Sequence, residues 1–178
     1  MSNQDAANTR TWALKLSGDS PDDQVEALRQ ISNAEQVRGL AVVVVALSGS
    51  SDDEVRMWSA EALEVAIQPD PSEVQGLIQQ LQKAVDGEIC YWAATMLGRL
   101  GTEAVGAVAA LEACLRESMY LPARERAAWA LSRIGPAASA AVPALTEAAD
   151  TAPPRLQRLA SEALRVIGGQ DGSDEIAA

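Results

Sequence analysis

Apolar residues recur along this chain at the spacing of an α-helix, and the helices that they mark recur at a fixed interval. Five leucines anchor the repeat, at separations of 35, 34, 34 and 33 residues: Leu28, Leu63, Leu97, Leu131 and Leu164. Residues one, four and eight positions before an anchor share its face of a helix, as Ala62, Ser59 and Val55 do with Leu63. The pattern therefore predicts one helix, called helix A here, in each of five units.

A second helix is predicted after each of the first four A helices. Apolar residues 11, 14 and 18 positions after the anchor mark this helix B: Val74, Leu77 and Leu81, then Val108, Leu111 and Leu115, then Val142, Leu145 and Ala149. The first unit fits with one inserted residue. A pair of helices cannot bury its apolar face alone, so neighbouring units stack. We expect an all-α, right-handed α-solenoid of four to five two-helix repeats, with about ten helices and no sheet.

Helix ends follow from glycine and aspartate. Gly101, Gly135 and Gly168 each lie four residues after an anchor, where glycine tolerates the left-handed conformation that stops a helix. Asp53 and Asp86 precede A helices, where a carboxylate accepts hydrogen bonds from free backbone N–H groups. We expect the same structural role for the carboxylate pairs 22–23 and 52–53, rather than an acid–base role.

The two ends of the chain depart from the repeat. We divide the chain into a capping helix and turn (1–20), a solenoid (21–168) and an acidic flexible tail (169–178). The run Val42–Val45 is apolar on every side, which predicts a fully buried helix B, although a strand is the alternative because valine favours strands. We expect the capping helix around Trp12 to pack on this helix B and to cover part of the run.

Two of the units resemble HEAT-like repeats, in particular the short type first named from phycobilisome lyases. The matching residues are Val55-Arg56, Ala127-Ala128, Ala130-Leu131, Ile134-Gly135 and the run from Ala141 to Leu145. The resemblance covers roughly residues 21–168 and implies an armadillo-type fold that serves as a protein–protein interaction scaffold without intrinsic catalysis. The alternative is an accessory subunit of a bilin-lyase-like or other enzyme complex. The tetratricopeptide repeat ranks second, because Trp58 and Trp92 lack the Leu-Gly that its pattern needs.

Composition narrows the function classes. The net charge is −11, with 14 basic against 25 acidic residues, which disfavours nucleic acid and anionic membranes as partners. A protein partner that is basic or apolar at the contact fits better. Neither an export signal nor an apolar run of membrane-spanning length is seen in the sequence, so we expect a cytoplasmic protein.

The sequence offers little chemistry. Histidine is absent, which removes the iron ligands of deoxyhypusine hydroxylase, a catalytic HEAT-repeat relative. HEAT-like DNA glycosylases need a basic concave face, which the composition opposes. The repeat register predicts that Cys90 is exposed and Cys114 partly exposed, with no electropositive surroundings to activate either thiol. We therefore predict no catalytic residue, cofactor or metal site.

The outward positions of the A helices carry most of the aromatic residues. We expect Trp58 and Trp92 to fill seams between neighbouring A helices. Met57, Tyr91 and Trp129 lie where other repeats hold polar residues, which predicts a partner-binding ridge on the convex face, since exposed Trp and Tyr often anchor interfaces. The competing site is a shallow alanine groove on the B helices, formed by Ala109, Ala113, Ala144 and Ala148.

Overall fold

The computed structural model describes residues 3–169, and this part of the chain is a stack of helices. Ten α-helices follow one another: α1 (Asn3–Leu16), α2 (Pro21–Ser32), α3 (Ala41–Leu47), α4 (Asp53–Val65), α5 (Val74–Lys83), α6 (Gly87–Leu100), α7 (Val108–Glu117), α8 (Leu121–Ile134), α9 (Val142–Thr151) and α10 (Pro154–Ile167). Three 3₁₀ turns, at 71–73, 101–107 and 135–141, lead into α5, α7 and α9. An isolated bridge between Val37 and Ile67 is the only strand-like pairing within this range.

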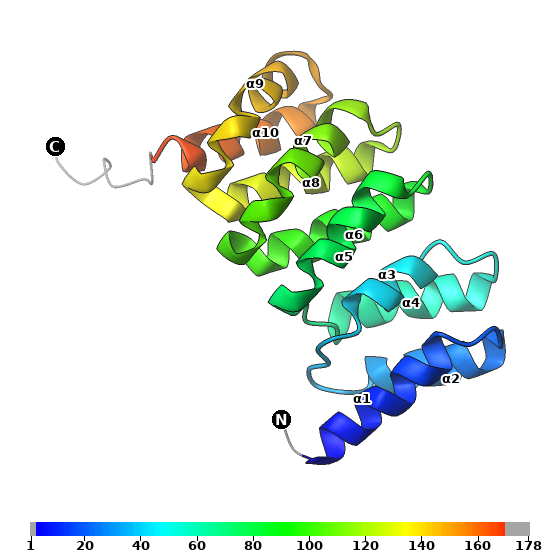
Figure 1. Ribbon diagram of the computed structural model, residues 1–178. Helices are drawn as coiled ribbons and strands as arrows, with labels where there is room; N and C mark the ends of the chain where they lie inside the picture. Colours follow the sequence, from blue (N-terminus) through cyan, green and yellow to red (C-terminus); the bar gives the residue numbers. More distant parts are fainter. Residues whose placement is uncertain (1–2, 170–178) are drawn as a thin grey trace, which may run out of the picture.

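The helices form two layers (Figure 1). The A layer consists of α2, α4, α6, α8 and α10, and the B layer consists of α1, α3, α5, α7 and α9. Each B helix packs on the A helix of the next unit, as α7 does on α8 and α9 on α10. The predicted right-handed α-solenoid of two-helix repeats is confirmed. Four anchors, Leu28, Leu63, Leu97 and Leu131, are fully buried between the layers, and Leu164 in the last helix is half-buried.

The A layer is uneven along its length. Helices α6 and α8 pack closely, whereas α4 and α6 make little direct contact. Arg99 of α6 crosses this seam and donates from Nη1 to the carbonyl oxygens of Leu63 (2.5 Å) and Ile67 (3.2 Å) at the end of α4. A guanidinium therefore satisfies carbonyl groups that the helix leaves without an internal partner.

A helix, α1, lies in the segment where the capping helix is predicted, but its packing differs from the prediction. Helix α1 packs mainly against α2 and touches α3 less. Its Trp12 Nε1 donates to Gln30 Oε1 of α2 at 2.9 Å. The reason is that α1 takes the place of a B helix in this stack, so it rests on the following A helix. Within the valine run, Val44 and Val45 are buried, but Val42 and Val43 are only half-buried, so the prediction of burial on every side was wrong.

The predicted helix ends are found in the structure, and two of them are shifted by one residue. Gly101 (φ 58°) and Gly135 (φ 76°) end α6 and α8 as expected, whereas after α10 Gly169 has the positive φ (73°) in place of Gly168. Asp86 caps α6, accepting from the backbone N of Glu88 at 2.7 Å. For α4 the cap is Asp52, not Asp53. Apart from Gly169, the predicted tail (169–178) lies outside the described residues.

The shifted cap of α4 gives a direct test. Asp52 Oδ1 accepts from the backbone N of Val55 at 3.0 Å, while Asp53 makes only an exposed ion pair with Arg56. We expect Asp52→Ala to lower the free energy of unfolding by about 1 kcal/mol. The matched Asp53→Ala variant should change it by less than about 0.5 kcal/mol, because an exposed ion pair contributes little. Urea unfolding followed by circular dichroism measures both, and equal losses would contradict the assignment.

Candidate functional site

The fold brings together two of the three residues that the sequence singled out. Tyr91 of α6 and Trp129 of α8 are both half-buried and line one pocket of 420 Å³ on the A layer. Met57 of α4 is more than half exposed and does not line this pocket. The predicted ridge is therefore a two-residue cluster in the structure, with Met57 apart from it on the same layer.

Arg126 of α8 joins the two rings, and sequence reasoning missed it. Its guanidinium carbon lies 4.9 Å from the centre of the Tyr91 ring and 5.6 Å from that of Trp129. Its Nη2 also donates to Tyr91 Oη at 2.7 Å. A cation over an aromatic face is attracted by the ring's electrons, so this stack holds both rings in place. The spacing of three residues between Arg126 and Trp129 on one helix was the available signal.

Trp129 packs in the seam between α6 and α8 and is also partly exposed at the surface. The edge of its ring lies against Gly98 of α6, and a Cβ placed on Gly98 would be 2.7 Å from Cε3 of Trp129. In the alignment of the repeats, Thr95 corresponds to Trp129 and Glu125 corresponds to Tyr91. Both are buried, so these positions are less exposed than the alignment suggested. Thr95 donates to the carbonyl of Tyr91 and Glu125 pairs with Arg155 at 3.2 Å, which allows polar side chains there.

The rim of the pocket carries charges of both signs. Besides the stack, it is lined by Glu88, Tyr120, Pro122, Glu125, Arg155 and Leu159. Tyr120 Oη donates to Glu88. This hydrogen bond, together with partial burial, raises the pKa of Tyr120 to about 12. We call this group of side chains around Tyr91, Arg126 and Trp129 the A-layer pocket.

The raised pKa of Tyr120 predicts a loss of stability at high pH. The unfolded chain releases this proton near pH 10 and the folded chain only near pH 12, so stability is full below pH 10 and falls as the pH rises towards 12. Tyrosinate absorbance should show a late titration step. We expect Tyr120→Phe to abolish this step and Glu88→Gln to move it towards pH 10. A late step that survives in Tyr120→Phe would contradict the assignment.

Both cysteines are more buried than the repeat register predicted. Cys90 and Cys114 are free thiols, each only 7% exposed. Cys90 Sγ lies 3.7 Å from the carbonyl oxygen of Ala84, and Cys114 Sγ lies 3.8 Å from that of Ala123. Burial raises the pKa of the Cys90 thiol, and it raises that of Cys114 to about 12. The register failed because it describes one helix, whereas the turn before α6 covers Cys90 and the start of α8 covers Cys114.

The predicted Trp58 seam and the predicted alanine groove lie apart from the A-layer pocket. Trp58 packs beneath Arg29 of α2, with the guanidinium carbon 5.0 Å from its ring centre, so it fills the α2–α4 seam as predicted. The alanine groove is not continuous. Ala144 and Ala148 are buried between helices, Ala109 is exposed and Ala113 is half-buried. Close helix packing explains the first two alanines.

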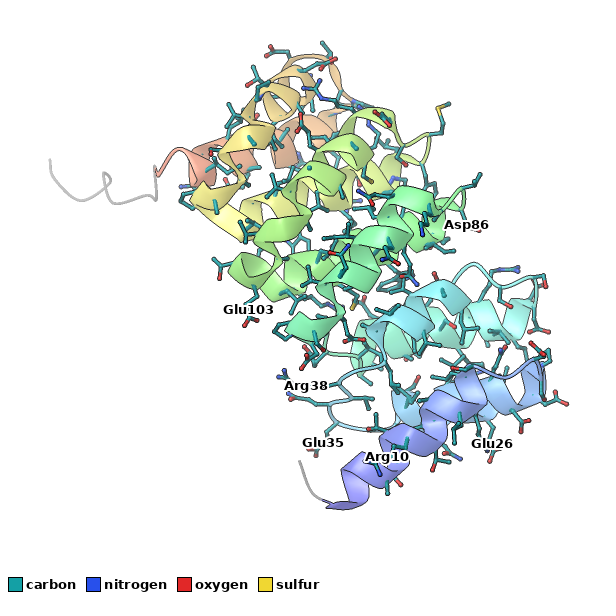
Figure 2. All side chains as sticks on the ribbon, viewed as in Figure 1. Arg10, Glu26, Glu35, Arg38, Asp86 and Glu103 are labelled. Carbon is teal, nitrogen blue, oxygen red and sulfur yellow. The ribbon has the colours of Figure 1, made fainter. Side chains whose placement is uncertain are left out.

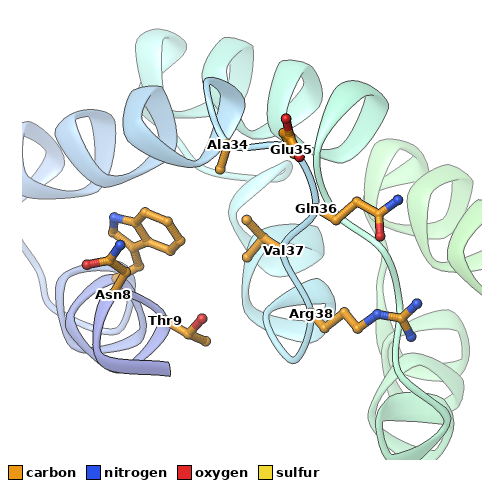
Figure 3. Close-up of a pocket in the computed structure, with 8 residues that line it drawn as sticks. Asn8, Thr9, Ala34, Glu35, Gln36, Val37 and Arg38 are labelled. Carbon is orange, nitrogen blue, oxygen red and sulfur yellow. The ribbon is translucent and has the colours of Figure 1, made fainter. Parts of the chain in front are cut away.

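A pocket at the start of the solenoid lies where α1 packs on the rest of the chain. It measures 720 Å³ and lies between α1 and the segment that follows α2, lined by Asn8, Thr9, Trp12, Ala34, Glu35, Gln36, Val37 and Arg38. Figure 3 shows Val37 pointing towards α1 while Arg38 points away from it. Its apolar lining, formed by Trp12, Ala34 and Val37, packs against the core where α1 rests on the solenoid.

Comparisons with known proteins agree with this architecture. A sequence profile described as HEAT repeats matches residues 74–165, and it does not distinguish the phycobilisome-lyase type. The designed armadillo repeat protein YIII(Dq)4CqI is similar in structure, with a TM-score of 0.59 and 17% identity. The designed armadillo repeat protein YIII(Dq.V1)4CPAF, in complex with the peptide (KR)4, has a TM-score of 0.62 and 18% identity. Each of these two structural matches covers 91% of this chain and 82% of the designed protein. No curated protein matches the sequence.

No helix within residues 3–169 is both long and apolar enough to cross a bilayer. No three side chains of the kinds that ligate metals come together in this part of the chain.

Proposed function

We propose that this chain, which belongs to the HEAT repeat family, binds another protein through the A-layer pocket and catalyses no reaction itself. Repeat solenoids of this fold are typically protein-binding scaffolds, because stacking units present long continuous surfaces. The cytoplasmic location and the absence of a cofactor remain predictions that accompany this proposal.

The observation that carries the proposal is the stack of Tyr91, Arg126 and Trp129. Tyrosine, tryptophan and arginine are the residue types most often found as energetic anchors at interfaces. Here all three line one pocket and are held by mutual contacts before any partner arrives. Side chains that are already ordered lose less conformational entropy on binding, which favours affinity.

The partner's chemistry follows from the charge. The chain carries a net charge of −11, and Glu88 adds an exposed carboxylate to the pocket rim. A basic or apolar surface on the partner complements this charge. The similar designed armadillo protein is in complex with an alternating Lys-Arg peptide, which is consistent with a basic partner for an acidic solenoid. Met57 would contribute only where the partner extends along the A layer as far as α4.

The proposal is tested with a partner captured from the native source and identified by mass spectrometry. With that partner purified, we expect Trp129→Ala to weaken binding by at least about tenfold and Ala109→Arg, at an exposed position of α7 in the B layer, to leave it unchanged. Arg155→Glu supplies a second variant at the exposed rim; because it removes the ion-pair partner of the buried Glu125, it is compared only where it stays folded. Calorimetry measures the affinities, and thermal unfolding confirms that each variant is folded.

The reverse outcome has a clear meaning. Binding that is lost in Ala109→Arg and kept in Trp129→Ala and Arg155→Glu would exclude the A-layer pocket as the contact.

A further inference from the structure

Two fully exposed apolar side chains face solvent from successive turns. Val85 lies between α5 and α6, and Met119 lies between α7 and α8; both are completely exposed. Both turns lead from a B helix to the next A helix, at the edge of the solenoid where Asp86 is labelled in Figure 2. A single exposed apolar residue is ordinary, but two at neighbouring turns form a candidate contact.

A cleft of 580 Å³ lies between these two turns. Its lining comes from α5, α6 and α7 and from the turns themselves, and is mostly apolar. Leu81, Cys90 and Cys114 are among its buried members. Because burial keeps both thiols protonated, they add no charge to the cleft. We call this feature the turn cleft.

The walls of the turn cleft are fixed in place. Tyr120 packs directly on the backbone of Gly87, where a Cβ would lie 2.5 Å from the Cβ and Cγ of Tyr120. The Tyr120 hydroxyl donates to Glu88, so the α7–α8 turn is tied to the start of α6. A binding surface that is held in shape loses little entropy when it is occupied.

Acidic side chains surround the turn cleft. Glu117 lines it, and Asp86 and Glu88 lie exposed at the start of α6. Lys83 at the end of α5 is exposed nearby, and Arg124 is half-buried with its Nε donating to the carbonyl of Leu115. The same edge continues with further acids at the starts of the preceding A helices: Asp22, Asp23, Asp52, Asp53 and Glu54. A basic ligand would meet a favourable field along this edge.

We infer that the turn cleft is a docking site for a segment of another protein that carries aliphatic side chains flanked by Lys or Arg. An aliphatic side chain of the partner enters between Val85 and Met119. The flexible thioether of Met119 adapts to the shape of this side chain. The flanking cations face Glu117 and Asp86. This surface is separate from the A-layer pocket, although Tyr120 lines both.

A synthetic peptide provides the probe. A fluorescent peptide with two leucines between Lys and Arg residues is compared with one in which serine replaces the leucines and one in which Glu replaces the cations. We expect the first to bind, each of the others to bind at least about tenfold more weakly, and the affinity to fall as salt rises. Equal binding of all three peptides, or no binding by the first, overturns the inference.

Matched variants locate the site. Val85→Ser combined with Met119→Ser should weaken binding at least about tenfold, whereas Val65→Ser combined with Val105→Ser, two half-exposed valines elsewhere, should not. Glu117→Lys should weaken it more than Glu103→Lys, which makes the same charge change at the opposite edge of the solenoid (Figure 2). Equal effects in variant and control overturn the inference.

Methyl labelling of methionine separates this surface from the A-layer pocket. The chain has four methionines, of which Met119 borders the turn cleft and Met57 lies on the A layer. We expect the peptide to shift the Met119 methyl signal in an NMR spectrum and to leave that of Met57 and the Trp129 indole signal unchanged. A shift at Trp129 alone would place the peptide in the A-layer pocket and overturn the inference while supporting the proposed function.

Discussion

Leu131→Ala is expected to lower the free energy of unfolding by about 2–5 kcal/mol. Leu131 is a fully buried anchor in α8, which packs against α6, α7 and α10. Removing its side chain loses the transfer free energy of the deleted methyl groups and leaves a cavity that rigid helices cannot fill. Because α8 has neighbours on both sides, the loss should lie in the upper part of this range. Urea unfolding monitored by circular dichroism gives the value.

The control for Leu131 is a residue of similar apolar size in the same half of the chain. Met119 is fully exposed, so Met119→Ala should change the free energy of unfolding by no more than about 0.5 kcal/mol. Similar losses in both variants would mean that the anchor is not part of the core. A second informative comparison is Leu164→Ala, whose half-buried side chain in the last helix should cost less than Leu131.

Gly98→Ala is expected to destabilise the protein by about 1–3 kcal/mol, although alanine is the better helix former. The new Cβ would lie 2.7 Å from Cε3 of Trp129 and 3.1 Å from Cα of Ala130. The ring can swing outwards, but the backbone of Ala130 in the closely packed α8 cannot move away freely. Overpacking therefore outweighs the gain of about 1 kcal/mol that alanine brings to a helix interior.

The Gly98 experiment also reports on the A-layer pocket. Displacing the Trp129 ring separates it from Arg126, so near-ultraviolet circular dichroism should change together with stability. Gly106→Ala is the control, because nothing lies within 4 Å of the new Cβ there, and it should be neutral or slightly stabilising. If Trp129→Ala in the Gly98→Ala background restores no stability, the clash is not the cause.

The site was only partly predictable from the sequence. Repeat alignment placed Tyr91 and Trp129 on the same side of successive A helices, because a fixed period preserves direction from unit to unit. It could not indicate that Arg126 lies between the two rings, since that contact joins α6 to α8 and depends on how closely the two helices approach. The same distance decides that Thr95 and Glu125, at equivalent positions, are buried.

The sequence by itself determined the helices, their pairing in a repeat and the residues that form the core, since helical periodicity is a local property that each segment carries. The tertiary structure alone decided what happens at the turns. Cys90 and Cys114 are buried, and Val85 and Met119 border a cleft, because neighbouring turns cover one pair and leave the other in solvent. Such burial depends on how the segment before or after a helix folds back on it, as Ala84 does on Cys90 and Ala123 on Cys114, which the periodicity of one helix does not encode.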